Sequence, residues 1–215
     1  MLNTANLTST LRGMKKLFVA DPTYAVRSKK FITLFQDYCE EELRARGIES
    51  GGLHIEKEQN ISVGRGKVEA DVGVFNAANE PVLIVDVRSQ MSSLGKNFNN
   101  YIRMKAGEVE SIHSVYPSCV VGLVYIHPAA DVPTKRPVNP IGSFNYENAA
   151  KQLSSLIVSN STTELLSKYQ HVSYCVIDFN SNPPQLSANI PTEDELRLEH
   201  FFDDVVASLN QAQLA

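Results

Sequence analysis

Two aspartates and an arginine occupy neighbouring segments in which side chains alternate between apolar and polar. Segment 68–75 carries Asp71, and segment 82–90 carries Asp86 and Arg88. Because successive side chains of a strand point to opposite faces, Asp86 and Arg88 would share one face. A turn centred between residues 78 and 79 would pair residue i with residue 157 − i and set Asp71 against Asp86. A slip of one residue would separate the two carboxylates onto opposite faces.

Two carboxylates placed in this way would repel each other unless a cation lay between them. Ligands that are all oxygen suit a hard divalent ion, and we expect Mg²⁺, with Mn²⁺ as the alternative. Such an ion polarises a phosphoryl oxygen and activates water, while Arg88 could stabilise charge on a phosphate. The competing interpretation is a solvated hairpin in which Glu69 simply pairs with Arg88. The apolar run that surrounds Asp86, Leu-Ile-Val-Asp-Val, favours the metal site.

The surrounding pattern predicts the elements that would hold these side chains. We expect helices over residues 29–46, 96–115, 146–158 and 193–209. We expect strands over residues 53–61, 68–75, 82–90, 119–126 and 172–179, and a proline-rich loop over 128–142. This order is typical of an α/β fold with a mixed β-sheet flanked by helices. No linker divides the chain, so a single domain over residues 1–215 is expected.

Asp71, fourteen intervening residues and then Asp86-Val87-Arg88 resemble the PD-(D/E)XK nuclease motif. With the polar loop and helix start at 92–101, the combination is most similar to type II restriction endonucleases. The resemblance covers about residues 31–126 and implies a restriction-endonuclease-like αβββαβ core at about 27–127, which residues 128–215 complete. It also implies that Asp71 and Asp86 are the metal ligands and catalytic residues. Glu42, or its neighbour Glu41, would add a ligand from the first helix.

The chain departs from the family pattern where Arg88 stands in place of a lysine, and Ala70 in place of a proline. Arginine keeps its charge at any accessible pH, so Arg88 cannot act as a base. Three alternatives follow. The arginine acts electrostatically as a catalytic residue, a lysine such as Lys57 or Lys96 comes from elsewhere, or the protein binds DNA without cutting it.

Polar and basic residues on the helix that follows the second aspartate suit a nucleic-acid face. They are Lys96, Asn97, Asn100 and Arg103. The proline-rich loop at 134–136 is a further candidate for DNA contact. The leading hypothesis is a Mg²⁺-dependent endonuclease of the type II restriction kind, which cuts double-stranded DNA at a short specific sequence as a homodimer. The alternatives are a catalytically silent DNA-binding or assembly protein with a nuclease fold, and a structure-selective repair or recombination nuclease.

Composition excludes several other classes of protein. The 215 residues carry a formal net charge of −4 and 43% hydrophobic side chains, which argues against disorder and against a basic, non-specific nucleic-acid coat protein. No apolar run reaches the length of about 20 residues that a membrane crossing needs, and residues 1–20 lack a signal-peptide core. The three cysteines are widely spaced, so we expect free thiols and a cytoplasmic protein.

Overall fold

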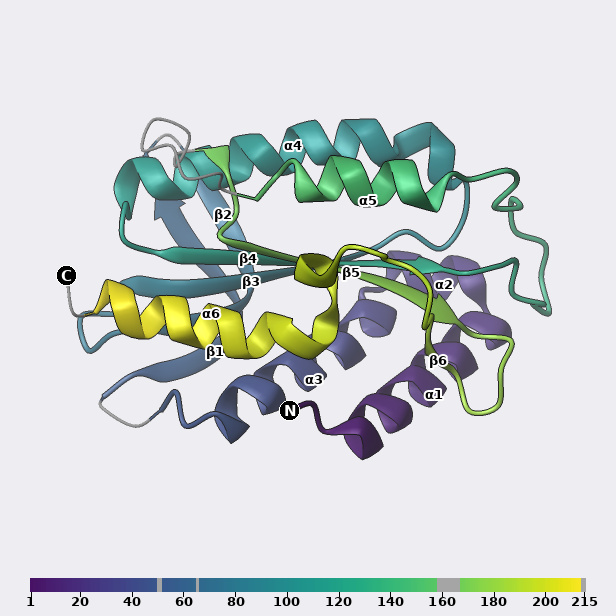
Figure 1. Ribbon diagram of the computed structural model, residues 1–215, viewed down its shortest axis with the longest axis horizontal. Helices are drawn as coiled ribbons and strands as arrows, with labels where there is room; N and C mark the ends of the chain where they lie inside the picture. The colour runs from purple at the N-terminus through teal and green to yellow at the C-terminus, as the bar shows by residue number, and fades with distance from the viewer. Residues whose placement is uncertain (50–51, 65, 158–166, 214–215) are drawn as a thin grey trace.

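A six-stranded mixed sheet runs through the molecule, with helices on both of its faces (Figure 1). The computed structural model describes residues 1–49, 52–64, 66–157 and 167–213. The strands are β1 (His54–Val63), β2 (Gly66–Phe75), β3 (Pro81–Ser89), β4 (Val120–Pro128), β5 (His171–Asp178) and β6 (Gln185–Leu186). The helices are α1 (Thr4–Ala20), α2 (Pro22–Arg27), α3 (Lys30–Ala45), α4 (Leu94–Val115), α5 (Tyr146–Ser154) and α6 (Leu198–Ala212), with a 3₁₀ turn at Asp194–Leu196.

Spatial order in the sheet follows chain order, β1-β2-β3-β4-β5-β6. β1, β2 and β3 pair antiparallel, β3, β4 and β5 pair parallel, and β6 adds an antiparallel edge. Every residue of β4 is buried, as the apolar run at 119–126 predicted for a central strand. The predicted mixed sheet flanked by helices is therefore confirmed.

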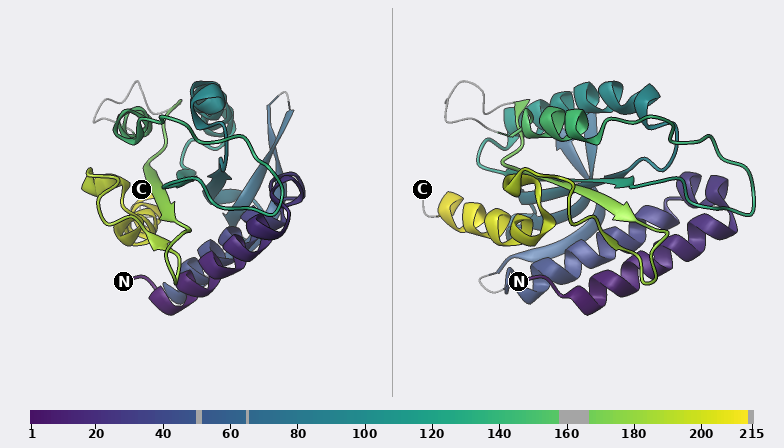
Figure 2. Two further views of the ribbon diagram at one scale, coloured as in Figure 1. Left: turned by 90° about the vertical axis from the view of Figure 1, so that its right-hand side faces the viewer. Right: turned by 45° about the vertical axis from the view of Figure 1, so that its right-hand side comes forward.

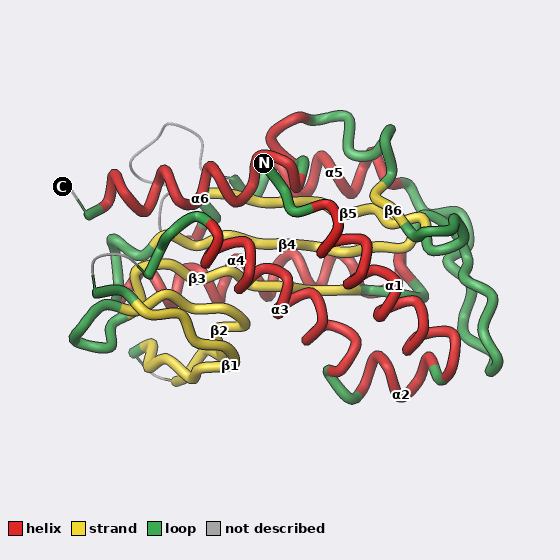
Figure 3. The backbone as a smooth tube through the Cα atoms, turned by 90° about the horizontal axis from the view of Figure 1, so that it is seen from below, coloured by secondary structure: helices red, strands yellow, loops and turns green. Residues whose placement is uncertain are grey.

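The sheet separates two apolar cores. α1, α3 and α6 cover one face, which Figure 3 shows from their side, and α4 and α5 cover the other. The first core receives Val85 and Val87 of β3, whereas Ile84 points into the second. This alternation places Asp86 on the α4 side of the sheet, next to Ile84 in the pleat.

Some predicted elements were wrong or incomplete. Helices α1 and α2 and strand β6 were not predicted. The helix expected over 193–209 is interrupted, because Arg197 takes an extended conformation (φ −79°, ψ 137°) and α6 begins only after it. α5 ends at Ser154, earlier than expected, and the predicted end at residue 158 lies outside the described residues. Among the helices of the described ranges, none combines the length and apolar character that a membrane crossing requires.

Candidate active site

The two aspartates lie where β2 and β3 separate. Val72 pairs with Val85 and Gly73 with Ile84, which is the predicted register. Cross-strand pairing ends there: β2 continues alongside β1, and β3 continues alongside β4. Asp71 and Asp86 occupy the next position, at the opening between the two strands. The predicted register therefore holds from Val72 to Val74, whereas it shifts by one residue next to the turn, where Phe75 pairs with Pro81.

Asp71 is held inside this opening by groups from two elements. Its Oδ2 atom accepts a hydrogen bond of 2.8 Å from the backbone N–H of Val87, and its Oδ1 atom accepts one of 2.8 Å from Nε2 of Gln36 on α3. The residue is only 2% exposed. The Asp71 carboxylate thus satisfies a β3 amide that no longer has a β2 carbonyl opposite it.

Asp86 is surrounded by cations. Nζ of Lys105 lies 2.7 Å from its Oδ2 atom, and Nε of Arg88 lies 3.1 Å from its Oδ1 atom. The Tyr169 hydroxyl donates a longer hydrogen bond of 3.4 Å to Oδ2. Within the described residues, Oδ1 of Asp86 accepts no hydrogen bond, so its contact with Arg88 is an ion pair alone.

Lys105 is a site residue that the sequence analysis missed. It is 1% exposed, and its ammonium group contacts both Asp86 and Glu108 of the same helix. A signal for its burial was present, because Lys105 continues the apolar spacing of Phe98, Ile102, Val109 and Ile112 along α4. Of the two predicted substitute lysines, only Lys57 can be placed, and it lies elsewhere. Lys57 pairs with Asp37 and Glu40, and the Lys96 side chain lies outside the described residues.

The pKa values of the two aspartates are shifted in opposite directions. Burial, together with the hydrogen bond and charge of Asp86, raises the pKa of Asp71 to about 8. Burial also acts to raise the pKa of Asp86, but the charges of Lys105 and Arg88 outweigh it and lower that pKa. At neutral pH, Asp71 therefore carries the proton and Asp86 the negative charge. The compensation expected from a metal is supplied here by two protein cations and a proton.

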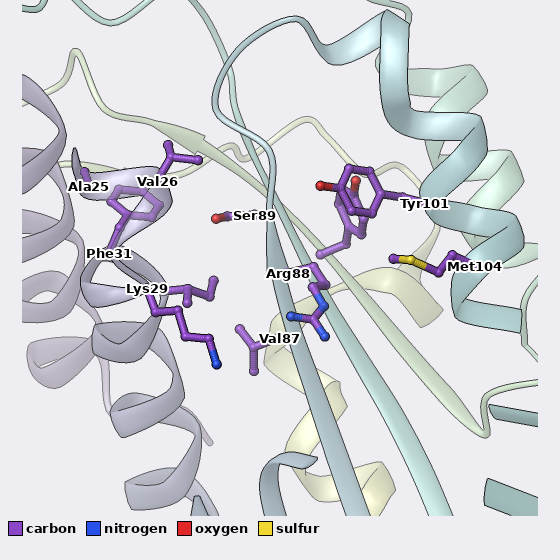
Figure 4. A pocket seen from close by; sticks show the side chains of 11 residues that line it. Ala25, Val26, Lys29, Phe31, Val87, Arg88, Ser89, Tyr101 and Met104 are labelled. Carbon is purple, nitrogen blue, oxygen red and sulfur yellow. The ribbon is translucent and has the colours of Figure 1, made fainter. Parts of the chain in front are cut away.

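The site borders a cleft of about 350 Å³ between α2–α3 and α4 (Figure 4). Lys29 and Val26 form one wall, Tyr101 and Met104 of α4 form the other, and Arg88 projects between them from β3. The cleft therefore combines two cationic side chains with apolar and aromatic walls.

The competing hairpin interpretation is wrong, because both aspartates are buried and no Glu69–Arg88 pair forms. The Glu69 carboxylate instead binds Lys29 at 2.6 Å.

The structure does not bring Glu42 to the aspartates. Glu42 is buried, yet its carboxylate binds Arg46 at 2.6 Å and the backbone N–H of Asn3 at 2.8 Å. From the same helix, Gln36 reaches Asp71 instead. The neighbouring alternative, Glu41, is exposed and accepts a hydrogen bond from Asn6.

The predicted DNA-binding residues are only partly described. Asn100 and Arg103 are exposed on α4, and the side chains of Lys96 and Asn97 lie outside the described residues.

A divalent cation at this site would have Asp71 and Asp86 as its protein ligands and water as the rest. The described residues contain no cluster of three or more His, Cys, Asp or Glu side chains that could hold a metal. Mg²⁺, however, usually keeps several waters and needs only one or two carboxylates. The Oδ1 atom of Asp86 accepts no hydrogen bond from the described residues, but it is buried and lies 3.1 Å from Arg88 Nε. Half-exposed Arg88 would have to turn toward the cleft to admit the ion.

No family model, no curated protein and no solved structure matches this chain.

Proposed function

We propose that the protein is a Mg²⁺-dependent endonuclease that hydrolyses phosphodiester bonds of double-stranded DNA. The observation that carries this proposal is the buried Asp71–Asp86 pair, with Lys105 Nζ 2.7 Å from Asp86, beside a cleft lined by Arg88. The element order α3-β1-β2-β3-α4-β4 supports a restriction-endonuclease-like core of the PD-(D/E)XK kind. Cleavage at a short specific sequence would place the protein among the type II restriction enzymes.

Each side chain would have a distinct task. Mg²⁺ held by Asp71 and Asp86 would polarise the scissile phosphate and acidify the attacking water. Arg88 lines the cleft and would contact the phosphate, where its fixed charge stabilises the transition state. Gln36 and the Val87 N–H hold the Asp71 carboxylate in place.

Lys105 is a positioning residue. It holds Asp86 ionised and fixes the orientation of that carboxylate. The missing family lysine would thus have a functional replacement on α4. This is the second of the three alternatives left open by Arg88, with Lys105 in place of Lys57 or Lys96.

A homodimer would match a palindromic target, since a two-fold symmetric site pairs with a two-fold symmetric protein. Sedimentation of the protein with and without a specific duplex would measure this stoichiometry.

The decisive experiment incubates the protein with unmethylated plasmid or phage DNA, in Mg²⁺ and in EDTA. Discrete fragments that appear only with Mg²⁺ support the proposal. Asp71→Asn should abolish cutting, whereas the matched control Asp204→Asn, at an exposed position of α6, should cut like the wild type. Cutting by Asp71→Asn at the wild-type rate would reject the metal assignment.

One observation favours a second candidate function, a catalytically silent DNA-binding protein. Lys105 and Arg88 already neutralise the carboxylates, so the pair is compensated without a metal. Retained binding of duplex DNA with no cutting in Mg²⁺ or Mn²⁺ would favour this candidate. Nicking that depends on DNA structure rather than sequence would instead indicate a repair or recombination nuclease.

A further inference from the structure

Positive charge is concentrated at the start of the chain. Residues 1–36 contain a single acidic residue, Asp21, and six basic residues, Arg12, Lys15, Lys16, Arg27, Lys29 and Lys30. This segment has a net charge of +5, although the whole chain carries −4, so the remainder carries −9. The protein is acidic overall, yet this basic segment forms α1, α2 and the first part of α3.

The fold adds further cations to this segment from the proline-rich loop. The backbone N–H of Lys135 donates a hydrogen bond of 3.1 Å to the Val19 carbonyl at the end of α1. Arg136 forms an ion pair of 2.6 Å with Asp21. The loop consequently runs beside α1 and α2 at one end of the molecule (Figure 2). Arg12, Lys16 and Lys135 line one open hollow of about 510 Å³ there.

Six of these cations have no acidic group within ion-pair distance among the described residues. Lys15 donates a hydrogen bond to the Ser181 carbonyl and Lys30 lies over the Tyr24 ring, which leaves four. We call them the basic surface: Arg12, Lys16, Arg27 and Lys135. All four are exposed. In contrast, the charges of Lys29 and Arg136 are compensated by Glu69 and Asp21. The basic surface is therefore free to bind an external anion.

The basic surface leads toward the cleft that contains Arg88. Arg27 lines a hollow of about 400 Å³ between α2 and the loop residues Pro137 and Asn139. That hollow shares Val26 with the cleft beside Arg88. A polyanion bound along α1 and α2 would thus lie next to the cleft that Arg88 lines.

The chemistry of α1 distinguishes a nucleic acid from a lipid surface. Leu7, Leu11, Met14 and Phe18 of α1 are buried in the core against the sheet, and Leu17 and Val19 are partly buried beside it. The helix therefore has no continuous apolar face to enter a membrane, and its exposed residues are Arg12 and Lys16 together with small or polar side chains. We propose that the basic surface binds the phosphate backbone of duplex DNA. This proposal takes its ligand from the proposed function, but it does not require hydrolysis.

The experiment compares two double variants that each remove two positive charges. Arg12→Ala/Lys16→Ala changes the basic surface. Lys67→Ala/Lys151→Ala is the matched control on β2 and α5, at exposed positions outside the basic surface. Fluorescence anisotropy measures the Kd of a labelled 20-base-pair duplex in EDTA, between 50 and 300 mM NaCl. Urea denaturation verifies that both variants fold as stably as the wild type.

We expect Arg12→Ala/Lys16→Ala to weaken binding about tenfold at low salt and to reduce the slope of log Kd against log salt by about 2. The control should stay within about twofold. Equal losses would mean that net charge alone matters, and a larger loss in the control would place the DNA outside the basic surface. Either result would overturn the proposal, as would undetectable binding by the wild type at 50 mM NaCl.

Two further measurements separate the remaining explanations. Sedimentation with phosphatidylserine vesicles tests the lipid alternative. Vesicle binding that depends on Arg12 and Lys16, without DNA binding, would contradict the assignment to nucleic acid. Cleavage assays in Mg²⁺ report on hydrolysis independently. A protein that binds through the basic surface but never cuts would refute only the nuclease proposal, whereas one that cuts but ignores these charges would refute only this inference.

Discussion

Lys105 Nζ lies 2.7 Å from Asp86 Oδ2, inside the protein and on the α4 side of the sheet. The two side chains are 1% and 10% exposed, so this ion pair is almost fully desolvated. Removing one member of such a pair leaves an uncompensated buried charge. Glu108 compensates Lys105 only in part, because its own side chain is 30% exposed.

Lys105→Met should therefore lower the free energy of unfolding by about 3–5 kcal/mol. The double variant Lys105→Met/Asp86→Asn should lose less than the sum of the single variants, because it removes both charges. Urea denaturation at pH 7.5 measures all three variants. Lys151→Met, at an exposed position, is the control and should change stability by less than about 0.5 kcal/mol. Strict additivity would show that the ion pair contributes nothing.

The two aspartates should respond differently to the same substitution. Asp71→Asn should stay within about 1 kcal/mol of the wild type at neutral pH, because Asp71 already carries the proton and asparagine still accepts a hydrogen bond from Val87 N–H. Asp86→Asn should cost several kcal/mol because it leaves Lys105 without its main partner. Chemical denaturation provides the comparison. The reverse order would mean that the proton resides on Asp86.

Substitutions of Arg88 test whether its fixed positive charge contributes to DNA cleavage. Arg88→Lys keeps a charge beside the cleft and should retain substantial cleavage. Arg88→Ala should lower the rate by about 10²–10³, as expected when one preorganised donor is lost. Single-turnover rates at saturating Mg²⁺ measure both variants against the wild type. Equal rates in all three would refute the catalytic role of Arg88, and a large gain in Arg88→Lys would show that arginine suppresses the site.

His127 should make stability depend on pH. It is fully buried in β4, its Nδ1 atom shares a hydrogen bond of 2.8 Å with the Tyr174 hydroxyl, and burial lowers its pKa to about 3. An unfolded histidine titrates near pH 6.5, so the unfolded chain binds a proton at a higher pH than the folded chain does. The contribution of neutral His127 is thus complete above about pH 6.5. It is lost as pH falls toward 3, at up to about 1.4 kcal/mol per unit.

His127→Phe should flatten this part of the pH profile. Unfolding free energies at pH 7.5, 6 and 5 measure the slope, and His200→Gln, at an exposed position, is the control. An unchanged slope in His127→Phe would indicate that other groups dominate acid sensitivity.

The pairing of β2 with β3 could be predicted from sequence because alternation and a short turn both constrain the register. Helix α1 could also have been predicted, because Leu7, Leu11, Met14 and Phe18 recur at helical spacing. The expectation for residues 1–20 concerned only the absence of a signal-peptide core. The break in the helix at Arg197 could not be predicted from sequence, because a single extended residue leaves the helical spacing of apolar residues intact on both sides. Long-range contacts such as Tyr169 with Asp86 depend on tertiary packing that local pattern does not encode.

The carboxylate site draws on segments that are distant along the chain. Gln36 and Tyr169, which contact its two aspartates, stand 133 positions apart in the sequence. Contacts of such high sequence separation form only after large loops have closed, which is entropically costly and slow. A nascent or partly folded chain would hold Asp71 and Asp86 without Lys105 to neutralise them. Only Arg88 of the same hairpin would then compensate the two side chains, so the site becomes complete only in the native topology.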